Sequence, residues 1–211
     1  KGHFHDPVSL TVGQMHAALK QWPQTIAVLT QALELHPEHE SVAECMFLIG
    51  YASFMEELYA DAIAWLKRLN ETYPEHERLE ESTYWLGMAH LFSASYIEAF
   101  AIFDRYLGAF PNSPYLEDAA FRRAVCQYGQ SLFAEAEKSL LAFAERYPQS
   151  KLLGEAHMML ADIAGSVGQA RLAIARFDQA IACGDDLNIE LYNYCCFRRG
   201  EMSKELEDFP D

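Results

Sequence analysis

Apolar residues recur along this chain at the spacing of amphipathic helices, and the helical segments come in pairs. Residues 41–55 place apolar side chains at helical spacing, and residues 61–72 form a second amphipathic run. Tyr73-Pro74 ends the second run, because proline lacks an amide donor and disfavours helix in the residue before it. The pattern therefore predicts a hairpin of two helices.

This hairpin repeats along the chain with a period of 37 residues. Four sets of positions, here called columns, share that period and keep one chemical character. The columns are Pro37, Pro74, Pro111 and Pro148; Gly13, Gly50, Gly87, Ala124 and Ala161; Thr25, Ala62, Ala99, Ala136 and Ala173; and Leu29, Leu66, Phe103, Leu140 and Phe177. We expect the small residues to lie where the two helices of a hairpin cross. We expect large ones, such as Leu66, to fill the space between neighbouring units. One hairpin cannot bury its apolar face alone, so the stacked array is the folding unit.

The columns resemble the tetratricopeptide repeat, whose pattern is matched by Leu86-Gly87, Ala99-x3-Phe103 and Pro111. The resemblance covers roughly residues 8–185. It implies an all-α fold, a right-handed superhelical solenoid of about five helix hairpins plus a C-terminal helix. Phe110-Pro111-Asn112-Ser113 and its counterpart at 147–150 resemble bacterial cell-envelope members, of the Tol-Pal-associated coordinator and outer-membrane assembly lipoprotein types. Ser113 and Ser150 are expected as helix N-caps.

The period also predicts the organisation of the chain. Residues 1–7 form a lead-in, 8–186 hold the repeats, 187–207 form a terminal helix and 208–211 a tail. The repeats are expected at about 8–39, 40–76, 77–113, 114–150 and 151–186. The sequence of residues 197–200 is similar to that of residues 121–124, which suggests that the terminal helix is the first half of a sixth unit. It either caps the array or belongs to a chain cut from a longer one.

The resemblance implies a binding groove, because family members usually hold peptides on the concave face lined by the first helix of each unit. In three units the groove positions follow the spacing i, i+4, i+7, which places each set on one helical face. These partner-binding candidates are Phe47, Tyr51, Phe54, Tyr84, Met88, Leu91, Phe121, Val125 and Tyr128. Apolar anchors of this kind suit a peptide. The alternative is that the stripe is ordinary core between repeats.

A fifth column is acidic and lies early in each first helix. Its members are Glu44, Glu81, Asp118 and Glu155. One interpretation is stabilisation of the helix dipole near an N-terminus. The other is a negative rim that selects a basic or polar partner.

Composition narrows the classes of partner. The chain has 211 residues and a net charge of −15, which argues against nucleic acid and anionic membrane surfaces. No stretch of about 20 residues is apolar enough to span a bilayer. The five cysteines show no metal-ligand spacing, and His3 and His5 are two residues apart by chance, so we expect no metal site and no cofactor. Motifs of phosphate loops, zinc proteases and serine hydrolases are absent, so we expect no enzyme.

These observations predict a non-enzymatic protein–protein interaction module, a scaffold or adaptor that binds a partner segment in its groove. The alternative is a structural subunit of a larger assembly, one of the cell envelope for instance, that packs through its ends, and self-association stays open. The repeat motif favours the bacterial periplasm or cell envelope, the cysteines favour the cytoplasm, and the motif weighs slightly more.

Overall fold

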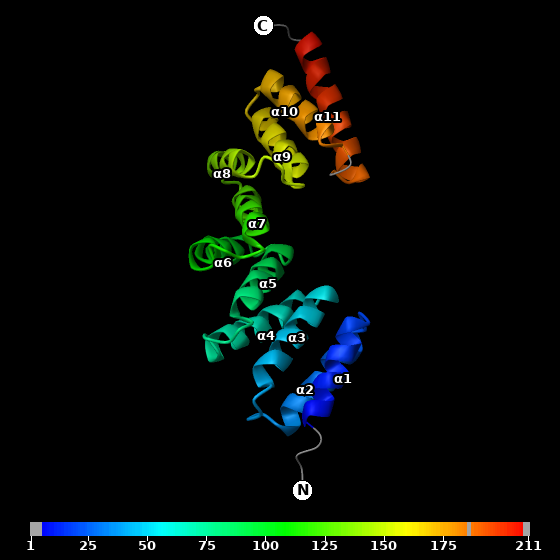
Figure 1. Ribbon diagram of the computed structural model, residues 1–211. Helices are drawn as coiled ribbons and strands as arrows, with labels where there is room; N and C mark the ends of the chain where they lie inside the picture. The colour runs from blue at the N-terminus through cyan, green and yellow to red at the C-terminus, as the bar shows by residue number, and fades with distance from the viewer. Residues whose placement is uncertain (1–5, 185–186, 209–211) are drawn as a thin grey trace. The chain divides into compact units, whose positions relative to one another are not determined.

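The computed structural model describes residues 6–184 and 187–208, and every regular element in these ranges is a helix (Figure 1). The expected all-α fold is confirmed. The main helices are α1 (Asp6–Ala18), α2 (Trp22–Leu35), α3 (Val42–Met55), α4 (Tyr59–Thr72), α5 (Leu79–Phe92), α6 (Tyr96–Ala109), α7 (Leu116–Gly129), α8 (Phe133–Arg146), α9 (Leu153–Ser166), α10 (Ala170–Ala182) and α11 (Ile189–Asp208).

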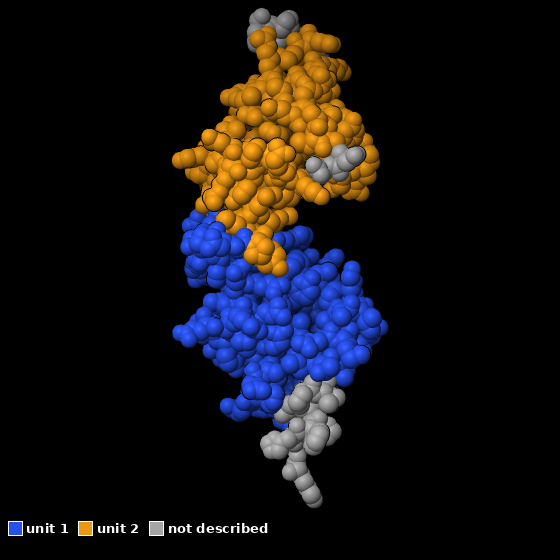
Figure 2. All heavy atoms as spheres, in the orientation of Figure 1, with its two compact units in different colours: residues 1–113 blue, residues 114–211 orange. Residues whose placement is uncertain are grey.

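The helices fall into two compact units, residues 1–113 and 114–211, which Figure 2 colours separately. Unit 1 holds three hairpins, α1–α2, α3–α4 and α5–α6. Unit 2 holds the hairpins α7–α8 and α9–α10, followed by α11. Within each unit the first helix of a hairpin packs on the second helix of the hairpin before it. Helix α11 packs on α10 in the same manner.

The column of small residues lies at the crossing of the two helices in each hairpin, as expected. A Cβ atom placed on Gly50 would lie 2.6 Å from Cγ of Leu66. One on Gly87 would lie 2.9 Å from the ring of Phe103. In unit 2 the equivalent positions are Ala124 and Ala161, both fully buried. Leu66, which we expected between units, therefore also lies against the glycine of its own hairpin.

One turn geometry closes all five hairpins. In each, the residue seven positions after the small column has a left-handed backbone. These residues are Lys20 (φ 57°), Glu57 (φ 60°), Ala94 (φ 59°), Ser131 (φ 60°) and Gly168 (φ 77°). After each of them the chain closes back on the first helix, as when the amide of Leu58 donates to the carbonyl of Ser53 at 2.9 Å. Only one of these turns uses glycine, so the turn could not be located from glycine positions.

In three connections between hairpins, the residue two positions after the proline of the 37-residue column accepts a hydrogen bond from a backbone amide. Nδ1 of His39 accepts the amide of Ser41 and Nδ1 of His76 that of Arg78, both at 3.2 Å. Ser150 Oγ accepts the amide of Leu152 at 3.1 Å. Ser150 is thus a turn residue. The expectation that it is a helix N-cap is wrong, because α9 begins only at Leu153.

Ser113 is not an N-cap either, because the N-cap of α7 is Tyr115. The oxygen of the Ser113 hydroxyl lies 2.6 Å from that of Tyr106 in the core of unit 1. The core of unit 2 continues to the end of the chain's helices. Leu187, Cys195 and Met202 are buried in one cluster with Phe177.

Candidate functional site

The nine groove candidates divide into buried and partly exposed side chains. Five are buried, with exposed fractions of 8% or less: Phe47, Tyr84, Met88, Leu91 and Phe121. Four are partly exposed: Tyr51, Phe54, Val125 and Tyr128. The column shared by Phe47, Tyr84 and Phe121 is core in all three hairpins. Only the four partly exposed residues have surface that a partner could contact directly.

In unit 1 the partly exposed candidates join other aromatic side chains in one cluster. We call Trp22, Tyr51, Phe54, Tyr59, Trp85 and Phe92 the aromatic cluster. The ring of Tyr51 lies edge-on to Trp22 at 5.6 Å and to Trp85 at 4.9 Å, measured between centroids. Phe54 lies 5.0 Å from Trp85 and 5.6 Å from Phe92. Five of the rings are partly exposed, and Phe92 is 54% exposed.

The sequence analysis missed Trp85, although this residue connects the cluster. Its indole touches Tyr51, Phe54 and Tyr84. Nε1 of Trp85 is buried and has no hydrogen-bond partner among the described residues. The available signal was the column itself: Trp85 takes the place held by Leu48 one repeat earlier. A tryptophan in place of an aliphatic residue marks an enlarged surface there.

The acidic column forms ion pairs in unit 1. The guanidinium of Arg78 contacts Oε1 and Oε2 of Glu44 at 3.0 Å and Oε2 of Glu81 at 2.8 Å. Hydrogen bonding to Glu44 is the main cause that raises the pKa of Arg78. The same guanidinium lies 4.8 Å over the ring of Phe47. One arginine therefore bridges two of the four carboxylates of this column and offsets one unit of their negative charge.

Tyr51 belongs to the aromatic cluster and is also affected by the charge of this ion group. Burial, and secondarily the charge of Glu81, raise the pKa of its phenol. The hydroxyl therefore stays protonated at neutral pH and can donate a hydrogen bond.

The other two acidic positions lie in unit 2. Asp118 is paired within its own helix, with Oδ1 3.1 Å from the guanidinium of Arg122. Glu155 lies in the first turn of α9. All four carboxylates of the column occupy first turns, which agrees with the helix-dipole interpretation.

Around Tyr128 the corresponding face of unit 2 combines an aromatic contact, with the ring of Phe133 at 5.5 Å between centroids, with a set of polar groups. The hydroxyl of Tyr194 donates to Asp162, with its oxygen 2.8 Å from Oδ1, and Arg198 lies 3.6 Å from the same oxygen. Burial raises the pKa of Asp162. Burial together with the bond to Asp162 raises the pKa of Tyr194 to about 12. The charges of Asp162 and Arg198 also act on Tyr128, so these four groups share one site.

A second concave feature lies on the second-helix side of unit 1. It is a groove of about 630 Å³ bordered by α4, α5 and α6. Its lining includes the apolar side chains of Leu86 and Ile102 and the polar ones of Asn70 and His90. Oδ1 of Asn70 and Nδ1 of His90 are buried without a hydrogen-bond partner among the described residues. Its volume lies within the range of small-molecule and peptide-anchor sites.

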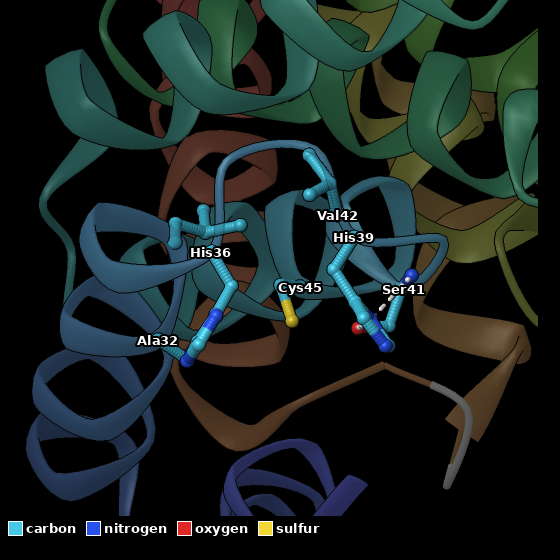
Figure 3. Close-up of a pocket in the computed structure, with 7 residues that line it drawn as sticks. Ala32, His36, His39, Ser41, Val42 and Cys45 are labelled. Carbon is cyan, nitrogen blue, oxygen red and sulfur yellow. Dashed lines mark hydrogen bonds between the residues drawn. The ribbon is translucent and has the colours of Figure 1, made fainter. Parts of the chain in front are cut away.

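Figure 3 shows a much smaller pocket of about 10 Å³ where α2 meets α3. His36, His39 and Cys45 line it, and Nδ1 of His39 lies 2.7 Å from Oγ of Ser41. The space holds about one water molecule, which is too little for a cofactor. In the part of the chain that the structure describes, no group of three or more His, Cys, Asp or Glu side chains could hold a metal ion. His3 and His5 lie outside the described residues.

Comparison with known proteins decides the family. The profile of the YfiO outer membrane lipoproteins matches residues 10–125, which is more than half of the chain, and a tetratricopeptide-repeat profile matches residues 118–150. The chain belongs to the YfiO family of outer membrane lipoproteins. The resemblance to tetratricopeptide repeats and to cell-envelope members is thereby confirmed. A search of the curated proteins finds no match.

Solved structures share the fold at low sequence identity. YrrB, described as a tetratricopeptide-repeat protein with an unusual peptide-binding site, is 17% identical with a TM-score of 0.69, covering 90% of either chain. The apo form of RapI is 15% identical with a TM-score of 0.76, covering 94% of this chain and 60% of its own. MamA from Desulfovibrio magneticus RS-1 is 13% identical with a TM-score of 0.71, covering 84% of this chain and 94% of its own.

The fold and the family together indicate the class of function. Tetratricopeptide-repeat and YfiO-type families are non-catalytic protein–protein interaction scaffolds, and the YfiO family favours the cell envelope. Among the described residues, no helix combines the length and apolar character needed to cross a membrane.

Proposed function

We propose that unit 1 binds a segment of another protein on the aromatic cluster, with Tyr51 and Phe54 as the central contacts. The observation that carries this proposal is the chain of ring contacts from Trp22 through Tyr51, Trp85 and Phe54 to Phe92. Aromatic side chains dominate the energetics of protein interfaces, because they bury large areas at a small cost in conformational entropy. In unit 2, Val125 and Tyr128 are the proposed contacts.

The buried candidates have a supporting role in this proposal. Phe47 and Tyr84 lie under the partly exposed rings and hold them in place: Phe47 stacks on Tyr51 at 6.2 Å, and Tyr84 contacts Trp85 at 5.3 Å. A rigid support reduces the entropy lost on binding. Met88, Leu91 and Phe121 belong to the same buried layer in their hairpins.

The charge of the chain indicates the chemistry of the partner. The net charge is −15, and the ion group of Arg78, Glu44 and Glu81 adjoins Tyr51. We infer a partner segment with apolar or aromatic anchors flanked by basic or polar residues, because opposite charges increase the association rate and exclude acidic competitors. We place this encounter in the periplasm, given the family.

The experiment is affinity capture from a cell-envelope extract with three baits compared in parallel. These are the wild-type chain, the double variant Tyr51→Ala/Phe92→Ala and the variant Ala101→Trp. Ala101 lines the 630 Å³ groove and is exposed, so tryptophan there obstructs the groove and leaves the aromatic cluster unchanged. Circular dichroism first verifies that all three are folded.

We expect a protein that the wild-type and Ala101→Trp baits hold and that the double variant loses. Loss with Ala101→Trp alone would move the binding site to the groove between α4 and α6. Capture that is identical for all three baits would contradict both sites.

A further inference from the structure

Helix α11 has the same phase as the first helices of the hairpins. When Gly200 is placed on the small column, Cys195 aligns with Cys45 and Met202 with Ala52. All four aligned residues are buried, with exposed fractions of 6% or less. Helix α11 therefore packs on α10 with the face that α3 uses against α2.

The opposite face of α11 is uncovered. In α3 this face consists of Ala43, Met46, Phe47 and Gly50, all buried and packed in one core with Leu66 and Leu69 of α4. The equivalent residues in α11 are Asn193, Cys196, Phe197 and Gly200, and all of them are exposed. Phe197 is 64% exposed, whereas Phe47 is 3% exposed. A Cβ atom on Gly200 would meet nothing within 4 Å.

In the part of the chain that the structure describes, no later segment covers this face. In the five hairpins, the residue seven positions after the small column adopts the left-handed backbone that reverses the chain. The corresponding residue in α11 is Glu207, which lies within the helix Ile189–Asp208. Within the described residues α11 therefore lacks the turn that would start a second helix in the register of the other hairpins.

We propose that the face formed by Ile189, Asn193, Cys196, Phe197 and Gly200 pairs with the same face of a second copy of this chain, with α11 antiparallel to α11. The small column shows what fits there: each hairpin places a leucine or phenylalanine against it. Phe197 is such a residue, three positions before Gly200 on the same face. In an antiparallel pair each Phe197 lies opposite the Gly200 of the other copy. The contact is self-complementary and closes as a two-fold dimer.

This inference does not rest on partner binding at the aromatic cluster. Two features of the chain set the strength of the pairing. A single helix pair buries less area than a standard protein–protein interface, so we expect a weak, reversible dimer. Each copy carries a net charge of −15, so the copies repel one another at low salt. Apolar burial drives the association, and added salt strengthens it by screening the repulsion.

The test is sedimentation of the full chain with a thiol reductant, from about 1 to about 100 μM, at low and moderate salt. We expect a reversible monomer–dimer equilibrium that salt strengthens. Phe197→Glu should weaken it at least tenfold, and so should Gly200→Leu, which fills the notch. Both positions are exposed, so both variants should keep the wild-type circular dichroism. Ile97→Glu is the matched control, since Ile97 is 69% exposed on α6 in unit 1.

Cys196 supplies a second, geometric readout. With Phe197 opposite Gly200, the two copies of Cys196 lie about 8 Å apart along the helix axis, given a rise of 1.5 Å per residue. A short bismaleimide should link them in the wild type and fail in Cys196→Ser and Phe197→Glu. A monomer over the whole range would overturn the proposal. A dimer unaffected by Phe197→Glu, or one in which Cys196 is not linked, would overturn it too.

Discussion

Units 1 and 2 are built on the same hairpin, yet they differ at the positions that the repeat leaves free. In unit 1 the two helices of each hairpin cross at a glycine. This unit also contains all three tryptophans of the chain, Trp22, Trp65 and Trp85. In unit 2 the helices cross at Ala124 and Ala161, and Tyr128 contacts the ring of Phe133 on a face that also carries the charges of Asp162 and Arg198. The columns that pack the hairpins therefore set the fold, while the remaining positions of the first helices set the surface and can differ between units.

The largest expected effect distinguishes the buried groove candidates from the partly exposed ones by the stability that each side chain contributes. Phe121 is fully buried in unit 2, so Phe121→Ala should lower the free energy of unfolding by about 3–5 kcal/mol. Denaturant unfolding followed by circular dichroism measures this loss. Tyr51→Ala, at a partly exposed position of unit 1, is the comparison variant and should cost clearly less.

The tryptophans sharpen that experiment, because all of them lie in unit 1. Their fluorescence reports on unit 1, whereas circular dichroism reports on both units. In Phe121→Ala we expect the dichroism midpoint to fall more than the fluorescence midpoint. Equal shifts would show that the units unfold as one cooperative block, as strong coupling between neighbouring repeats would require.

A second prediction concerns the positions where the two helices of a hairpin cross. In Gly50→Ala the new Cβ would lie 2.6 Å from Cγ of Leu66, so the variant should lose about 1–3 kcal/mol of stability. Gly108→Ala is the control, because Gly108 lies in α6 with nothing within 4 Å of a new Cβ. There alanine should gain about 0.5–1 kcal/mol through its better helix propensity. Thermal unfolding of both variants gives the comparison, and a stabilised Gly50→Ala would contradict the close crossing.

The repeat was predictable from sequence, because a helix crossing admits only small residues and returns every 37 positions. The division of the groove candidates into buried and partly exposed side chains was not predictable. Tyr51 and Tyr84 both fit a helical stripe, but first helices are covered from two sides, and spacing along one helix does not show which side neighbours cover. The hairpin turns were also hidden, since Glu57 and Ser131 adopt the left-handed backbone that usually marks glycine. The uncovered face of α11 required the structure, because Glu207 is helical where that turn was due.

A third, smaller effect compares the arginines of the two units. Arg78 joins two hairpins by binding Glu44 of α3 and Glu81 of α5. Arg78→Gln should therefore cost about 1 kcal/mol, and added salt should reduce this loss. Arg122 forms its ion pair with Asp118 of its own helix and lies over the ring of Phe121 in the same helix, so Arg122→Gln should cost about 0.3–0.5 kcal/mol. Equal losses in denaturant unfolding would contradict the bridging role of Arg78.

The smallest expected effect is a dependence of folding stability on pH, caused by one histidine in each unit. Burial lowers the pKa of His90 in unit 1 and of His157 in unit 2, so both are neutral in the folded chain near pH 7. In the unfolded chain a histidine titrates near pH 6.5. As the pH falls below about 6.5 the unfolded chain binds protons that the folded chain does not. Stability is therefore present above that pH and is lost as the pH falls through the lowered pKa of the folded state.

The two histidines should differ in size of effect because their neighbours differ. The charge of Arg176 adds to burial in lowering the pKa of His157. At His90 the charge of Glu98 opposes the lowering, and the charge of Lys67 adds a smaller contribution to it. Replacing His157 with glutamine should therefore remove more of the stability lost between about pH 7.5 and pH 5 than replacing His90. Denaturant unfolding at each pH measures both slopes against the wild type. A larger change in His90→Gln than in His157→Gln would contradict this order.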